Sequence, residues 1–209
     1  LQAWWIEMVS SLVKEPTVNV VRSRLDKHPY LKVPGEETRV ATLVRRWAEG
    51  LGLRHETYAR IPERENLLLH YGRGTSGRRL LIPTHSDVVP AGDGWASDPF
   101  TLSVDAAADR VYGRGVSDNK GAMAATLLAV KILKDCAIEL EGDLMLGIVA
   151  DEEVHSEEGV DYGLGFLMEQ GVLKADWTIV PDIGGNMKTL EVAEKGRVVY
   201  LVKAYGRQA

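Results

Sequence analysis

Six side chains in this sequence could do metal chemistry, and each follows an apolar run or lies in a glycine-rich turn. The first run, residues 80–87, is typical of a buried strand and ends in His85 and Asp87. Because residues two apart in an extended chain point to the same side, both can face one site. The other four are carboxylates that follow later runs or lie in the turn: Asp118, Glu152, Glu153 and Asp182.

Imidazole and carboxylate groups from separate strands are what a hydrolytic metal site needs. Taken singly, each is more often a satisfied polar group than a ligand, so only their convergence indicates a site. Two metals ~3.5–4 Å apart need a shared ligand, and an aspartate can bridge them with its two oxygens. One member of the pair Glu152 and Glu153 can bind a metal while the other acts as general base.

A histidine that binds a metal also needs an acceptor for its other ring N–H, because that hydrogen bond fixes the ring orientation. Asp87, two residues from His85, is the natural candidate. We therefore expect His85 to contact the metal and Asp87 to orient His85 from behind.

Strands and helices alternate around these residues. Apolar positions at helical spacing predict helices over residues 3–14, 35–52, 122–134 and 160–170. Shorter apolar or alternating runs predict strands over residues 53–58, 66–71, 80–87, 144–150 and 177–180. This alternation predicts an α/β fold with a largely parallel sheet, and ligands of such sheets bind at the carboxyl ends of the strands.

Two glycine-containing turns are expected to join strands. The turn over residues 72–77 predicts a hairpin between strand 66–71 and the strand that carries His85. It lacks a Gly-Lys-Ser/Thr ending, which argues against a phosphate loop. Residues 189–205 alternate around Lys195-Gly196 and predict two antiparallel strands at the start of a second domain.

The composition limits the class of protein. The chain has 209 residues, 45% hydrophobic and 26% charged, as in soluble globular proteins. A net charge of −5 argues mildly against nucleic acid or an anionic membrane as a partner. The single cysteine, Cys136, excludes an internal disulfide and fits a reducing compartment. No apolar run approaches the ~20 residues that span a bilayer and no signal peptide is visible, so a cytoplasmic location is expected.

Four linked motifs resemble those of one family of co-catalytic zinc peptidases. They are His85-x-Asp87-Val-Val-Pro90, Gly113-Arg-Gly-Val-Ser-Asp118-Asn-Lys-Gly121, Asp151-Glu152-Glu153 and Pro181-Asp182, and the resemblance covers residues 4–209. The family contains succinyl-diaminopimelate desuccinylase, acetylornithine deacetylase, glutamate carboxypeptidase and carnosinase-like dipeptidases. The resemblance implies a three-layer α/β sandwich around a mixed, mainly parallel sheet, with an inserted α+β dimerisation domain.

The resemblance also implies a set of metal ligands. His85 and Asp182 would hold one zinc ion, Glu153 would hold the other, and Asp118 would bridge both. Two Zn²⁺ ions would occupy each full-length active site, with Co²⁺ or Mn²⁺ as substitutes. The second zinc of the family takes a further histidine, which is expected beyond residue 209.

The same resemblance implies the reaction. Glu152 would be the general base, Asp87 would orient His85, and the peptide bond after Asp118 would be cis. A water activated by two zinc ions would hydrolyse an amide bond in an N-acyl amino acid or a short peptide with a free carboxylate.

The resemblance further implies how the chain is divided. Residues 1–194 would form the N-terminal part of the catalytic domain, and residues 195–209 the first strand region of the dimerisation domain. A histidine that usually follows a Gly-x-x-Ala stretch such as residues 206–209 would reach the active site of the partner subunit. The full-length protein would therefore be a homodimer, and this chain alone would be a poor catalyst.

Two other functions remain open. A zinc aminopeptidase of a related family also uses His-x-Asp, Asp and paired Glu, although Val-Val-Pro after Asp87 favours the first family. A non-catalytic protein that keeps the scaffold is the other alternative. An intact Glu152 argues against this alternative, because a scaffold has no need of a general base.

Overall fold

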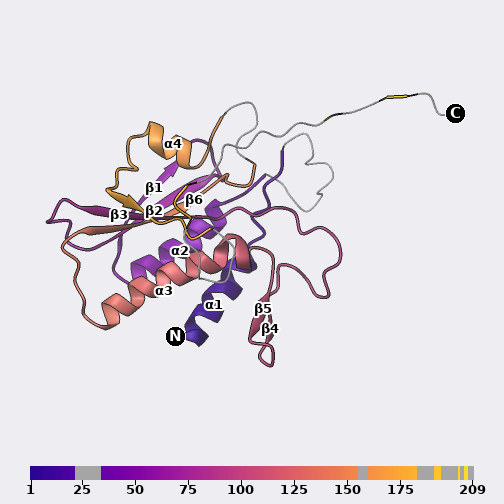
Figure 1. Cartoon of the computed structure of the whole chain (residues 1–209), viewed down its shortest axis with the longest axis horizontal. Helices are drawn as coiled ribbons and strands as arrows, with labels where there is room; N and C mark the ends of the chain where they lie inside the picture. Colours follow the sequence, from indigo (N-terminus) through magenta and orange to yellow (C-terminus); the bar gives the residue numbers. More distant parts are fainter. Residues whose placement is uncertain (22–33, 155–159, 183–190, 194–201, 203–204, 207–209) are drawn as a thin grey trace.

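The computed structural model describes residues 1–21, 34–154, 160–182, 191–193, 202 and 205–206, and a five-stranded mixed sheet lies at its centre (Figure 1). The two antiparallel pairs are β1–β2 and β2–β6, and the two parallel pairs are β6–β3 and β3–β7. Four of the five strands therefore run in the same direction. In spatial order the strands are β1 (Arg54–Ala59), β2 (Glu65–Tyr71), β6 (Asp143–Val149), β3 (Arg79–His85) and β7 (Trp177–Thr178).

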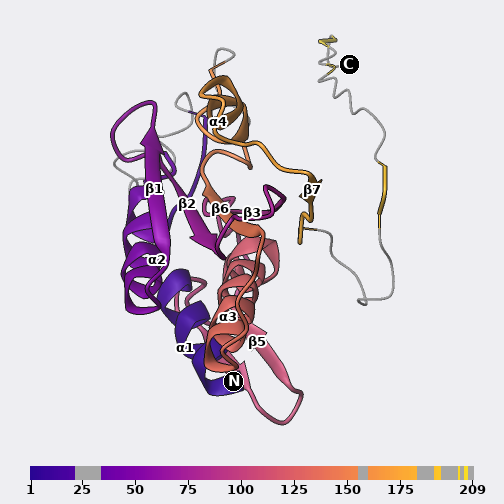
Figure 2. The ribbon, with the colours of Figure 1, turned by 90° about the vertical axis from the view of Figure 1, so that its left-hand side faces the viewer.

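Helices cover both faces of this sheet and make three layers (Figures 1 and 2). Three helices pack on one face and a short helix packs on the other. None of the helices in the described ranges is long and apolar enough to cross a bilayer. The three are α1 (Gln2–Val13), α2 (Thr38–Gly50) and α3 (Gly121–Asp135), and the short one is α4 (Leu164–Glu169).

The central strands are apolar on both sides because each side faces a helical layer. On β2, Leu67 and Leu69 pack into the core with α1, α2 and α3, whereas Leu68 packs into the core with α4. On β6, Leu146 packs into the core with α1, α2 and α3, and Met145 packs into the core with α4. This alternation confirms the predicted three-layer α/β sandwich and explains why these strands have near-continuous apolar sequences.

The predicted helices and strands are present with small shifts of their ends. The largest differences are in α2, which spans 13 residues instead of the predicted 18, and in α4, which spans six instead of the predicted eleven; β7 spans two residues instead of four. Before α4 begins, the carboxylate of Asp161 accepts hydrogen bonds from the N–H groups of Gly163 and Phe166. That local turn replaces the expected first helical turn.

The predicted hairpin through residues 72–77 is wrong. Strand β6 lies between β2 and β3, so the two strands flanking this turn do not pair. The turn instead packs on the segment that leads into β6, where Arg73 N–H donates to Leu140 C=O and Gly74 N–H to Gly142 C=O. The reason is burial, because every residue of β6 is buried and a strand of this kind needs a partner on both sides.

A small two-stranded sheet was not predicted. It consists of β4 (Ser103–Asp105) and β5 (Arg110–Tyr112), which pair antiparallel. Both strands are only three residues long and largely exposed, so they lack the apolar pattern that identifies a strand in sequence. The predicted strand pair over residues 189–205 and the predicted domain boundary at 194/195 fall mostly outside the described residues.

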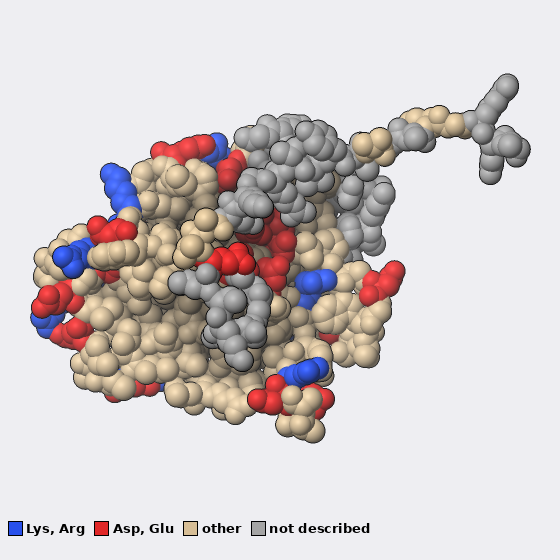
Figure 3. All heavy atoms as spheres, viewed as in Figure 1, with Lys and Arg blue, Asp and Glu red and all other residues tan. Residues whose placement is uncertain are grey.

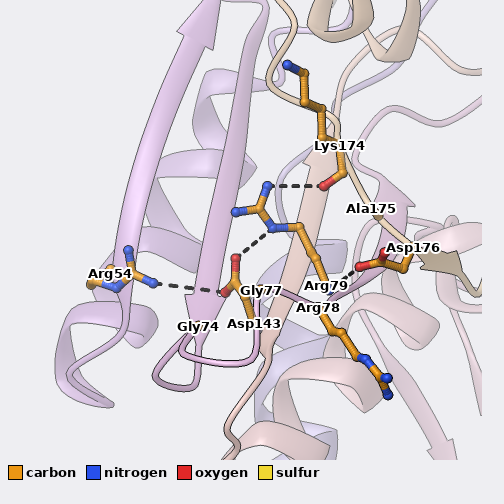
Figure 4. Close-up of a pocket in the computed structure, with 9 residues that line it drawn as sticks. All are labelled: Arg54, Gly74, Gly77, Arg78, Arg79, Asp143, Lys174, Ala175 and Asp176. Carbon is orange, nitrogen blue, oxygen red and sulfur yellow. Dashed lines mark hydrogen bonds and ion pairs between the residues drawn. The ribbon is translucent and has the colours of Figure 1, made fainter.

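A cleft of about 410 Å³ lies at the amino ends of β3 and β6, beside a buried carboxylate (Figure 4). Asp143 on β6 accepts from Arg79 Nε of β3 at 2.8 Å, contacts His70 Nδ1 of β2 at 3.0 Å, and lies 3.9 Å from Arg54 of β1. Arg79 also donates to the main-chain oxygen of Lys174. One aspartate therefore ties four neighbouring strands together at this edge.

Replacing Asp143 by leucine should lower the free energy of unfolding by about 2–3 kcal/mol, because Arg79 and the buried His70 lose their shared acceptor. Urea unfolding followed by circular dichroism measures this change. As a control, Asp135→Asn removes one exposed ion pair with Lys131 and should cost less than about 0.5 kcal/mol. Equal stability of the two variants would contradict the role given to Asp143.

Candidate metal centre

Three neighbouring parallel strands have their carboxyl ends on the same side of the sheet. A candidate site residue lies at or just after each of these ends. His85 is the last residue of β3, Glu152 follows β6, and Asp182 follows β7. The parallel register β6–β3–β7 brings these ends together. Asp118 reaches the same place from the turn at Val116–Lys120, where its own backbone is non-helical (φ −135°, ψ 94°), directly before α3.

Three of the six predicted residues form a close group. His85 Nε2 lies 2.7 Å from Asp118 Oδ1 and 3.7 Å from Asp182 Oδ1. Each of these three residues offers one atom that could bind a metal, and these atoms all lie within 4.8 Å of one another. His85 is buried whereas the side chain of Asp118 is 61% exposed, so the group opens toward solvent on one side.

The paired glutamates border this group without joining it. Glu152 Oε2 lies 3.9 Å from His85 Nε2. The Glu153 carboxylate accepts a hydrogen bond from Val89 N–H at 3.3 Å. The structure thus brings Glu152 and Glu153 to the site and points them to different neighbours, as expected for adjacent residues in a turn.

Asp87 lies behind His85 and is completely buried. The closest acceptor to His85 Nδ1 is the main-chain oxygen of Asp87 at 3.0 Å, with the carboxylate Oδ1 at 3.5 Å. The same carboxylate accepts hydrogen bonds from the N–H groups of Glu152 and Glu153, both at 3.1 Å. Asp87 therefore contacts the histidine and the glutamate turn together. The expected contact was that of its carboxylate with His85, but the main-chain oxygen is closer, and the contact with the glutamate turn was not expected.

The turn that carries Asp118 also positions Asp182. The peptide bond between Asp118 and Asn119 is cis, as the resemblance implied. Asn119 is buried, and its Nδ2 donates to Asp182 Oδ1 at 2.6 Å and to Pro181 C=O at 3.3 Å. Asn119 was not among the predicted site residues, although its place directly after Asp118 was a signal for it.

The same turn is anchored to α1 by a buried ammonium group. Lys120 Nζ donates to the main-chain oxygens of Leu12 and Glu15, at 3.0 and 2.6 Å. The Leu12 carbonyl belongs to the last turn of α1, where a positive charge is favoured, and Glu15 lies just after the helix. At Gly121, a Cβ would lie 2.1 Å from the main-chain oxygen of Val116, so only glycine fits there. Lys120 and Gly121 thus shape the turn behind Asp118 and are no part of a phosphate site.

Electrostatic effects at the site reflect burial among carboxylates. Burial would lower the pKa of His85, but hydrogen bonds and charges of Asp182 and Asp87 outweigh it and raise that pKa to about 11. Burial together with the charge of Asp118 raises the pKa of Glu153 to about 7. Burial would raise the pKa of Asp182, but hydrogen bonds from His85 and Asn119 hold it below its usual range.

This donor set fits a divalent zinc ion. One imidazole nitrogen and several carboxylate oxygens are the ligands that zinc binds in hydrolytic sites. Acidic side chains gather at the centre of one face (Figure 3). Among the described residues, neither lysine nor arginine forms an ion pair with Asp118, Glu153 or Asp182. A bound cation would balance this excess of negative charge and would compete with the proton on His85.

The chain is similar in sequence to known metal-dependent hydrolases. Succinyl-diaminopimelate desuccinylase of Gluconobacter oxydans is 32% identical over 148 residues, which are 68% of this chain and 37% of that protein. The Cys-Gly metallodipeptidase dug1 of Schizosaccharomyces pombe is 34% identical over 154 residues, 71% of this chain and 32% of that protein. The chain therefore spans about a third of the length of these relatives.

Comparison with solved structures supports the fold. Human carnosine dipeptidase 1 superposes with a TM-score of 0.67 at 18% identity, over 87% of this chain and 39% of that one.

A model of the peptidase family M20/M25/M40 matches residues 81–198, a segment that includes all six candidate residues. The chain therefore belongs to peptidase family M20/M25/M40, in agreement with the resemblance that its four motifs showed.

Proposed function

We propose that this chain carries the greater part of the metal site of a two-zinc hydrolase that cleaves an amide bond in N-acyl amino acids or short peptides. The observation that carries the proposal is the close group of His85, Asp118 and Asp182, whose donor atoms lie within 4.8 Å of one another. Membership of the M20/M25/M40 family supports the reaction class.

The metal ligands are assigned from the geometry and the family. His85 and Asp182 would hold one zinc ion, Glu153 would hold the other, and Asp118 would be a ligand of both. When bound, zinc supplies a Lewis acid that polarises a carbonyl and lowers the pKa of water to about 7. Asn119 holds Asp182 in place through its 2.6 Å hydrogen bond.

Glu152 is the proposed general base. Its carboxylate lies beside the metal ligands, 3.9 Å from His85 Nε2, and its side chain is 36% exposed, so water can reach it. In the reaction Glu152 takes a proton from the attacking water and returns it to the amine that leaves. Asp87 orients His85 and fixes the main chain of Glu152.

The names of the relatives support a small substrate. One is a desuccinylase and the other a Cys-Gly dipeptidase, so an acylated amino acid or a dipeptide suits this site. The full-length protein is proposed to be a cytoplasmic homodimer in which residues 1–194 belong to the catalytic domain and residues 195–209 begin the dimerisation domain. Neither nucleic acid nor a membrane is expected as a partner.

Zinc titration of the chain tests the ligand assignment. Isothermal titration calorimetry should detect one site stronger than the other, because the group of three provides the more complete ligand set. His85→Ala and Asp182→Asn should each weaken this site by at least about 100-fold, since even outer partners of metal ligands contribute 10–100-fold. His55→Ala is the control and should leave the affinity unchanged. Unaltered binding in His85→Ala would contradict the assignment.

The general base is tested in the longest natural polypeptide that contains this sequence. Glu152→Gln should lower the turnover number by about 10²–10⁴-fold, because proton transfer is lost. The zinc content, measured by atomic absorption, should stay at the level of the parent. Substantial residual turnover, or loss of zinc together with activity, would assign Glu152 another role.

A substrate panel separates the proposal from the aminopeptidase alternative. The panel contains N-succinyl and N-acetyl amino acids, dipeptides with a free carboxylate, and amino acid amides that lack a carboxylate. We expect turnover of one of the first three classes and none of the amides. Preferred cleavage of the amides would favour the aminopeptidase, and no turnover of any class with zinc bound would favour the scaffold.

A further inference from the structure

Asn19 joins two buried carboxylates of the site through one amide group. Its Nδ2 donates to Asp87 Oδ2 at 2.8 Å and to Asp151 Oδ1 at 2.9 Å. All three side chains are buried, with exposed fractions of 2%, 0% and 4% for Asn19, Asp87 and Asp151. An amide nitrogen has two hydrogens, so each carboxylate can receive one.

Both carboxylates hold the turn that carries the paired glutamates. Asp87 accepts the N–H groups of Glu152 and Glu153, and Asp151 immediately precedes them. Asp151 has a φ of +60°, a left-handed conformation that costs an ordinary residue about 1–2 kcal/mol. Contacts of its side chain therefore help to keep the main chain in this conformation, and Asn19 makes one of them.

Arg64 and Glu37 make further contacts with Asp151, and Arg64 shares the oxygen that accepts from Asn19. Arg64 Nη2 donates to Asp151 Oδ1 at 3.0 Å and to Glu37 Oε1 at 2.7 Å. Glu37 in turn accepts the main-chain N–H of Asp151 at 3.2 Å. The single guanidinium is the only Lys or Arg charge that the described residues place against Glu37 and Asp151. Asn19 therefore supplies hydrogen bonds to a cluster that is short of positive charge.

The main chain places Asn19 accurately, because its segment is hydrogen-bonded to the segment that follows His85. Asn19 N–H donates to Val88 C=O at 2.8 Å, and Val88 N–H donates to Thr17 C=O at 2.9 Å. The Thr17 hydroxyl also donates to the main-chain oxygen of Ser86. The Asn19 amide is thus fixed relative to His85 before any ligand binds.

We propose that Asn19 is a positioning residue that holds Asp87 and Asp151 together and thereby sets the geometry of His85 and of the Glu152–Glu153 turn for metal binding. The inference rests on the metal site proposed above. Asn19 touches neither the metal nor the substrate in this account and acts only through the two carboxylates.

Cobalt binding by the 209-residue chain tests the inference, since Co²⁺ replaces zinc and its visible spectrum reports the ligand geometry. Asn19→Leu removes both donors at similar volume, and Asn19→Ser keeps one donor in a smaller side chain. We expect the Kd for Co²⁺ to rise about tenfold in Asn19→Leu and less in Asn19→Ser, each with an altered absorption band, because partners of metal ligands contribute 10–100-fold.

Asp143→Leu is the matched control. It also removes a buried polar contact, but it lies at the amino end of β6, about 20 Å from the metal site at about 3.3 Å per residue of strand. It should lower the melting temperature without changing the Kd or the spectrum. Loss of affinity in Asn19→Leu but not in Asp143→Leu therefore shows positioning rather than reduced stability.

Three results would overturn the inference. If folded Asn19→Leu binds Co²⁺ like the parent, Asn19 has no positioning role. If Asn19→Leu does not fold, Asn19→Ser decides, and a Kd and spectrum equal to those of the parent reject the proposal. If the parent chain binds no Co²⁺ at all, the metal site fails, and this inference fails with it.

Discussion

The Asp87 carboxylate is removed from water completely, and a buried charge of this kind is stable only when hydrogen bonds satisfy it. Those bonds come from Asn19 and from the N–H groups of Glu152 and Glu153, and His85 lies next to them. Although burial alone would raise the pKa of Asp87, its partners hold that pKa below the usual range. The need to satisfy one buried charge thus fixes the relative positions of three separate segments.

The sheet provides the rest of the geometry. Parallel pairing of β6, β3 and β7 brings three carboxyl ends to one edge, and the turn before α3 adds Asp118. At the opposite end of the strands, Asp143 of β6 ties β3, β2 and β1 together. The two ends of the strands differ in their charge balance. The ion pairs at the amino ends are satisfied within the protein, whereas the carboxylates at the carboxyl ends exceed the positive charges that the described residues offer them.

The convergence of His85, Asp118 and Asp182 could be predicted because it follows from local patterns. Apolar runs mark buried strands, parallel strands present their carboxyl ends together, and the four motifs come in a family order. The place of β6 could not be predicted in this way. The turn at residues 72–77 has the residues of a hairpin, and only the burial of β6 on both faces decides that β6 enters between the flanking strands.

Asn19 could not be recognised from the sequence for a similar reason. Its partners lie 68 and 132 positions away in the chain, and no local pattern relates them. Asn119 lies inside a motif, but its side chain holds Asp182, which is 63 positions away in the chain. Side chains that position ligands are thus harder to recognise from sequence than the ligands, since their partners are set by the fold.

We propose that His85, Asp118 and Asp182 bind one metal ion together. Diffraction from crystals of the chain grown with zinc, recorded at the zinc absorption edge, tests it most directly. We predict an anomalous peak about 2.0–2.2 Å from His85 Nε2 and from a carboxylate oxygen of Asp118 and of Asp182. A zinc-saturated crystal with no peak among these three residues would contradict the account.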